Sequence, residues 1–158
     1  GASVLVDNTW ATPLLCKPLT LGADLAINAA TKYIVGHADA LLGTVTANAS
    51  HVARLMDFHG HFGLTVSGDE AYLGQRGLRT MAVRLARHQE TALKLAAWFA
   101  ARPEVERVLY PALPSDPGHS LWKRDFTGAS GLFGVELKPC PKQAVAAMLD
   151  GYHLFGMG

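Results

Sequence analysis

The first part of the chain alternates short apolar runs with polar turns. Three of these runs predict β-strands at Ala2–Val6, Leu25–Ala30 and Leu41–Ala47, the last one interrupted by Gly43. Between the first two, Pro13–Thr20 suits a loop and a short helix. Short apolar strands with helical links favour an α/β fold, in which helices flank a mostly parallel sheet on both faces.

From Ser67 onward the apolar residues recur at helical spacing. Ser67 and Glu70 match a capping box, in which each side chain bonds to the backbone N–H of the other residue. Thr80 is placed to cap a second helix, which we expect to run to about Arg102 and to stop at Pro103. The apolar positions that support these helices are Ala71, Leu73, Leu78, Met81, Leu85, Leu93 and Ala97.

After Pro103 the pattern returns to alternating strands and helices. We predict strands at Val105–Tyr110 and Gly131–Leu137, and helices at Gly118–Arg124 and Lys142–Leu149. We therefore expect two domains. Residues 1–102 would hold the large sheet and the long helix, and residues 103–158 would begin a smaller α/β domain.

Composition narrows the class of protein. The 158 residues are 49% hydrophobic and 17% charged, which is typical of a soluble globular chain with a real core. A net charge of +1 favours neither a nucleic-acid nor a membrane-surface partner, and no apolar run is long enough to predict a membrane span. Cys16 and Cys140 lack metal-ligand spacing and are interpreted as reduced, buried thiols of a cytoplasmic protein.

Asp7 and Lys32 form the candidate chemistry of the chain. Each follows a predicted strand, and cofactors in such sheets bind beyond the carboxyl ends of strands. A lysine amine can form a Schiff base with the aldehyde of pyridoxal phosphate, while a carboxylate keeps the ring nitrogen protonated. Taken alone, Lys32 is more often a solvated surface charge and Asp7 a turn residue.

The surrounding sequence favours a functional role for both residues. Five segments together resemble the cysteine and methionine metabolism family of pyridoxal-phosphate enzymes, across essentially the whole chain: Asp7–Pro13, Gly22–Asp24, Ala30–Asp39, Arg76–Thr80 and Trp122–Phe133. The motif around Lys32 is highly specific to this family. Trp10 and the segment from Trp122 to Phe133 are most similar to its cystathionine β-lyase branch.

The resemblance implies a fold type I enzyme that binds pyridoxal phosphate through Lys32, with Asp7 at the ring nitrogen and Thr31 at the phosphate. Lys32 would also act as the catalytic base, and no metal is implied. A serine that relatives place three residues before the lysine is replaced here by Ala29. Family members are longer on both sides, so we interpret this chain as an internal fragment that is inactive alone.

For the whole protein, the resemblance implies β-elimination of cystathionine, a small amino-acid substrate, to homocysteine, pyruvate and ammonia. It also implies a homotetramer built from dimers. A γ-lyase, a γ-synthase or a sulfhydrylase of the same family stays open, as does a non-catalytic fragment.

Two other groups of polar residues invite a functional interpretation. His51, His59 and His61 lack an accompanying cluster of ligands, so we expect no metal there. The arginines at positions 76, 79, 84 and 87 are expected to form a solvated helix face or to pair with Asp69 and Glu90.

Overall fold

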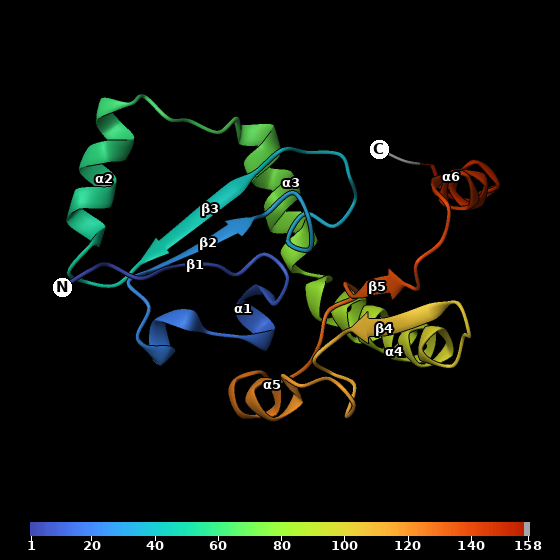
Figure 1. Ribbon diagram of the computed structural model, residues 1–158. Coiled ribbons are helices and arrows are strands. Elements are labelled where there is room, and N and C mark those ends of the chain that lie inside the picture. The colour runs from blue at the N-terminus through green and yellow to red at the C-terminus, as the bar shows by residue number, and fades with distance from the viewer. Residues whose placement is uncertain (157–158) are drawn as a thin grey trace.

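The computed structural model describes residues 1–156, and it confirms the α/β class (Figure 1). Strands β1 (Leu5–Asp7), β2 (Leu25–Ala29) and β3 (Gly43–Ala47) form one sheet in that order. Two links, helix α1 (Thr12–Leu15) and the 3₁₀ helix η1 (Pro18–Leu21), connect β1 to β2.

The expectation of a mostly parallel sheet was wrong. Strand β1 pairs parallel with β2, with Asp7 opposite Ile27, but β2 pairs antiparallel with β3. The reason lies in the connections. A parallel neighbour needs a crossover, which α1 and η1 supply between β1 and β2. Between β2 and β3 the chain forms only turns and bends, so it returns in the opposite direction.

The first strand is also shorter than the predicted Ala2–Val6. Before Leu5 the backbone bonds to the residue that precedes β2. The Val4 N–H donates to the carboxylate of Asp24 at 2.8 Å, and the Val4 carbonyl accepts from the Asp24 N–H at 2.9 Å. The Asp24 side chain thus replaces a ladder partner at the start of the strand.

Helix α2 (Val52–His61) was not predicted, whereas α3 (Gly68–Leu78) and α4 (Met81–Ala100) lie where the periodicity placed them. The predicted capping box of α3 is present, with both Ser67–Glu70 bonds formed. Thr80 does precede α4, but its side chain makes no capping bond. Its hydroxyl instead donates to the Gly77 carbonyl at 3.3 Å and accepts from Arg84 at 3.0 Å.

The C-terminal part confirms the predicted alternation. Strands β4 (Val105–Leu109) and β5 (Gly134–Leu137) pair antiparallel, with α5 (His119–Asp125) between them in sequence and α6 (Lys142–Asp150) after them. Ala92 and Ala96 of α4 pack in one core with residues that follow β4 and α5, namely Tyr110, Ala112, Leu113 and Ala129. The boundary at residue 103 stays a prediction.

A second core joins the turn after β2 to the beginning of α4. Ala30 and Ile34 pack against Met81 and Leu85 there, and Ala30 is fully buried. Cys16 is buried as expected, but Cys140 is exposed. Within the described residues, no helix combines the length and apolar character that a membrane span requires.

Candidate active site around Lys32

Asp7 ends β1 at the edge of the sheet where β2 also ends. Its Oδ1 accepts a hydrogen bond of 2.9 Å from the Thr9 N–H, the geometry of an Asx turn. Hydrogen bonding by Thr9, through its side chain and then its backbone N–H, lowers the pKa of the Asp7 carboxyl below its ordinary value. The carboxylate is therefore ionised at neutral pH, as a partner of a protonated ring nitrogen must be.

Thr9 connects Asp7 to the turn that carries Lys32. The Thr9 hydroxyl accepts from the Ala29 N–H at 2.7 Å, and the Ala29 carbonyl accepts from the Lys32 N–H at 3.0 Å. A continuous path of hydrogen bonds thus links the ends of the two parallel strands. Thr9 lies within the sequence motif. The one local signal for this role is that it follows Asp7 by two positions, as the N–H donor of an Asx turn does.

The Lys32 side chain is exposed and lines a cavity of about 450 Å³. The other lining residues include Thr9, Trp10, Tyr33 and His88. Among residues 1–156, the Lys32 amine has no hydrogen-bond or ion-pair partner. The cavity is of small-molecule size, and no protein contact has to break for the Lys32 side chain to reach a ligand in it.

Asp7 lines a neighbouring cavity of about 510 Å³. Trp10 and Leu132 line both cavities. The cavities beside Asp7 and Lys32 therefore share part of their lining, and Trp10, which is 64% exposed, is available to a ligand.

Thr31 has its hydroxyl directed at the backbone of Leu42. It accepts from the Leu42 N–H at 2.8 Å and donates to the Leu42 carbonyl at 3.3 Å. The donated bond is long for a hydroxyl, so a phosphate oxygen can compete for the same proton. Its role at the phosphate stays a prediction.

Arg84 departs from the expectation of a solvated arginine face. Its guanidinium is partly buried and bonds to backbone carbonyls, among them that of Tyr33 at 2.8 Å. Arg87 does pair with Glu90 at 3.1 Å, but Arg76 pairs with Asp39 rather than with Asp69. Helical spacing could not distinguish Arg84, because its partners come from a turn distant in sequence.

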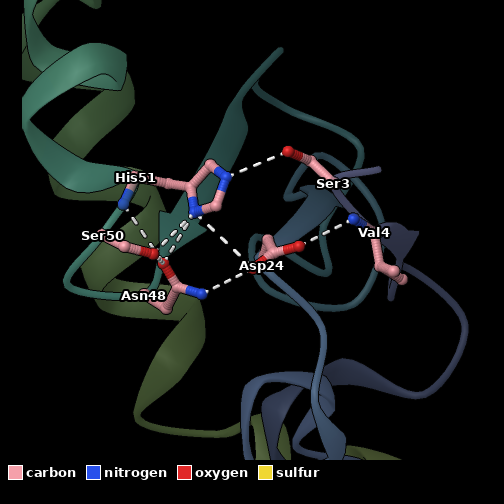
Figure 2. Close-up of polar contacts among 6 residues, drawn as sticks. All are labelled: Ser3, Val4, Asp24, Asn48, Ser50 and His51. Atoms are coloured by element: carbon pink, nitrogen blue, oxygen red, sulfur yellow. Dashed lines mark hydrogen bonds and ion pairs between the residues drawn. The ribbon is translucent and has the colours of Figure 1, made fainter. Parts of the chain in front are cut away.

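His51, one of the three histidines considered for a metal site, is bonded to other polar side chains. Figure 2 shows His51 bonded to Ser3 through one ring nitrogen and to Asn48 through the other, at 3.0 and 2.9 Å. The ring also lies 3.6 Å from the Asp24 carboxylate. Over residues 1–156, no three His, Cys, Asp or Glu side chains gather as metal ligands.

The residues at the sheet edge fit pyridoxal phosphate. The cofactor needs a free amine, an ionised carboxylate at its ring nitrogen and a cavity with an aromatic wall. Lys32, Asp7 and Trp10 supply these three features. Cavities of about 300–1,000 Å³ are typical of cofactor sites, and both cavities here fall in that range.

Comparisons with known proteins agree with this chemistry. The family model described as Cys/Met metabolism PLP-dependent enzyme matches residues 1–158. Cystathionine beta-lyase MetC of Escherichia coli (strain K12) and cystathionine beta-lyase of Salmonella typhimurium (strain LT2) are each 48% identical over 157 residues. Those matches cover 99% of this chain but only 40% of either relative, so the chain spans less than half the length of these enzymes.

A solved structure has a similar fold over the whole chain. Cystathionine gamma synthase from Xanthomonas oryzae pv. oryzae, in complex with cystathionine, has a TM-score of 0.93 and 40% identity. The match covers 100% of this chain and 41% of that one.

Proposed function

The chain belongs to the family of Cys/Met metabolism PLP-dependent enzymes, and we propose that the whole protein is a carbon–sulfur lyase that performs β-elimination on cystathionine. The products would be homocysteine, pyruvate and ammonia. The observation that carries the proposal is the 48% identity to cystathionine beta-lyase over nearly the whole chain. The free amine of Lys32 at a cavity supports it.

Pyridoxal phosphate, when bound, supplies an aldehyde that captures the substrate amine and a protonated ring that withdraws electrons from the substrate Cα. Lys32 has two tasks in this proposal. Its amine holds the cofactor before the substrate arrives, and after release it takes the proton from Cα as the general base. Among residues 1–156 no hydrogen bond or ion pair holds the Lys32 side chain, so it can move between these two tasks without breaking a protein contact.

Asp7 keeps the proton on the ring nitrogen. Its carboxylate is fixed by the Thr9 N–H and stays ionised, which favours the protonated ring. Thr31 is proposed to donate its hydroxyl proton to the phosphate, in exchange for its long bond to Leu42. Trp10 supplies an aromatic surface at the side of the cavity.

A γ-eliminating or γ-replacing enzyme of the same family is the second candidate, since the gamma synthase structure is so similar in fold. Such a reaction needs a further proton transfer at the substrate Cβ. The experiment that separates the two incubates the full-length protein with cystathionine. Pyruvate with homocysteine would support β-elimination, and 2-oxobutyrate with cysteine would overturn it in favour of the γ-reaction.

The remaining features of the whole protein follow from the same proposal. We propose a cytoplasmic homotetramer, in which residues 1–102 are the second part of the cofactor domain and residues 103–158 begin a smaller domain. Parts of the protein beyond this chain would hold the substrate carboxylate and complete the phosphate site, so the chain alone would not turn over substrate.

A further inference from the structure

Arg84 is the residue that binds the turn of Lys32 most extensively. One terminal nitrogen donates to the Tyr33 carbonyl at 2.8 Å, and the other donates to the carbonyls of Gly77 at 2.8 Å and Ile34 at 3.4 Å. Its Nε donates to the Thr80 hydroxyl at 3.0 Å. The guanidinium therefore joins the Lys32 turn to the junction of α3 and α4.

The turn needs these donors because it is neither helix nor strand. Residues 30–35 form consecutive turns. The Ala30 and Lys32 carbonyls accept from the N–H groups of Val35 and Gly36, each at 2.8 Å. The carbonyls of Tyr33 and Ile34 have no backbone donor among the described residues, and Arg84 supplies the donors for both. Without Arg84, two carbonyls directly after Lys32 would depend on water.

The position of Arg84 is not explained by stability of its own helix. It lies in the first turns of α4, where a positive charge is unfavourable to the helix dipole. Burial of the guanidinium lowers the pKa of Arg84, and no carboxylate among residues 1–156 pairs with it. It does lie at the last turn of α3, where the Gly77 carbonyl is a favourable partner for a cation.

Two glycines allow this close approach. Gly36 has a φ of +75°, and a Cβ there would collide with the Arg84 guanidinium. At Gly77 a Cβ would lie under 3.0 Å from the carbonyl oxygens of Ile34 and Val35. The turn, the end of α3 and Arg84 thus fit together only because both positions lack a side chain.

We propose that Arg84 is a positioning residue, which fixes the backbone of the turn so that the Lys32 amine points into its cavity. The guanidinium acts by its fork of N–H donors, since three carbonyls and a hydroxyl at different directions must be bonded at once. A lysine, with a point charge and a different shape, cannot reproduce this pattern. The catalytic consequence rests on the proposed function, whereas the fixing of the turn does not.

The test compares full-length wild type with Arg84→Ala, Arg84→Lys and the control Arg87→Ala, which changes a 74% exposed arginine on the same helix. Hydrogen exchange of the Val35 and Gly36 amides measures the turn directly. Reduction with borohydride, followed by peptide mass measurement, gives the fraction of Lys32 that holds pyridoxal phosphate. We expect Arg84→Ala to accelerate the exchange of both amides about tenfold or more, because unpaired buried groups are expensive.

In the same variant the cofactor-bearing fraction of Lys32 should fall, and kcat should fall more than KM changes. Arg84→Lys should recover less than half of each loss, and Arg87→Ala should match wild type. If Arg84→Ala does not fold, Thr80→Val removes one acceptor of Arg84 and should give a smaller change in the same direction. Wild-type exchange in Arg84→Ala, or full recovery in Arg84→Lys, would overturn the proposal. Because exchange is read without substrate, a wrong assignment of the reaction leaves this result unaffected.

Discussion

The turn that carries Lys32 and the helix α2 contrast in how they are held. Residues 30–36 have no regular secondary structure, yet Ala30 and Val35 are completely buried. Helix α2 is regular, yet none of its residues is buried. It lies at one end of the molecule in Figure 1, and an extended connection joins it to α3. Regular backbone hydrogen bonding and tertiary fixation are therefore separate properties in this chain.

The contrast extends to the side chains of each region. Around the turn, polar side chains bond to backbone groups: Thr9 to Ala29, Thr31 to Leu42 and Arg84 to Tyr33. At the end of α2 the aromatic rings of Phe58 and of Phe62, the residue after the helix, stack on each other and remain exposed. Exposed apolar groups of this kind promote association. The turn is bonded and packed within this chain, whereas Val52, Met56 and Phe58 of α2 stay exposed.

The largest expected effect is the loss of the Lys32 amine. In the full-length protein, Lys32→Ala should reduce the turnover of cystathionine by at least about 10³-fold, because both the covalent attachment and the base are lost. The fold should persist, because the exposed Lys32 side chain has no partner in the described residues. Pyruvate release and thermal unfolding measure the two properties.

The matched change on α2 is Arg54→Ala, which also removes an exposed cation. We expect turnover within about twofold of wild type, as for most exposed substitutions. Comparable losses of turnover in Lys32→Ala and Arg54→Ala would mean that the two regions do not differ in their importance for catalysis.

The second effect concerns the carboxylate of Asp7. An amide keeps the shape but cannot supply the negative charge that favours a protonated ring nitrogen. Since a neighbouring carboxylate raises the pKa of a protonated nitrogen by about one to three units, we expect Asp7→Asn to lower kcat on the order of 10²-fold. Asp57→Asn on α2 is the control, because Asp57 is 73% exposed and should leave kcat unchanged. A loss of only a few-fold in Asp7→Asn would show that Asp7 does not face the ring.

From the sequence, the helices and strands could be predicted better than the connections and pairings between them. Periodicity located the long helices and most strands, because those signals are local and are repeated over many residues. It missed α2, whose apolar positions cover no core. It also could not give the antiparallel pairing of β3, which depends on how the chain returns after the Lys32 turn.

The candidate site shows the same division. Asp7 and Lys32 were predicted, because each follows a strand and lies in a specific motif. Arg84 was not, because its partners Tyr33 and Ile34 lie about fifty residues earlier in the chain. Residues that bond to a distant backbone leave no periodic trace, so only the folded structure identifies them.

Two glycines test whether the Lys32 turn is packed more tightly than α2. The expected changes in the free energy of unfolding are small. Gly77→Ala would place a Cβ against the backbone of the Lys32 turn, and overpacking of this kind lowers the free energy of unfolding by about 1–3 kcal/mol. Gly60→Ala on α2 has nothing within 4 Å of the added atom. It should raise the free energy of unfolding by up to about 1 kcal/mol, through the helix preference of alanine. Urea unfolding of both variants measures the two values, and effects of the same sign would contradict the contrast.

The smallest effect is a pH dependence at the place where α2 is anchored. The Asp24 carboxylate accepts from the Val4 N–H and from the Asn48 amide, both at 2.8 Å, and His51 at the beginning of α2 lies beside it (Figure 2). Its hydrogen bonds, first that from Val4 and then that from Asn48, lower the pKa of Asp24. A lowered folded-state pKa means that this stabilisation is present above the ordinary carboxyl pKa and is lost as the pH falls through the lower folded-state value.

Hydrogen exchange of the α2 amides between about pH 2 and pH 5 should therefore show wild-type protection falling as the medium becomes more acidic, after correction for intrinsic rates. In Asp24→Asn the charge is absent throughout, so this part of the pH dependence should disappear. The difference should stay below about fivefold in exchange rate, as for other partly exposed charged groups. Asp57→Asn, in the middle of the same helix, should keep the wild-type profile, because both members of its pair with His61 are over 70% exposed: 73% and 74%. An unchanged profile in Asp24→Asn would show that α2 is held by contacts other than this network.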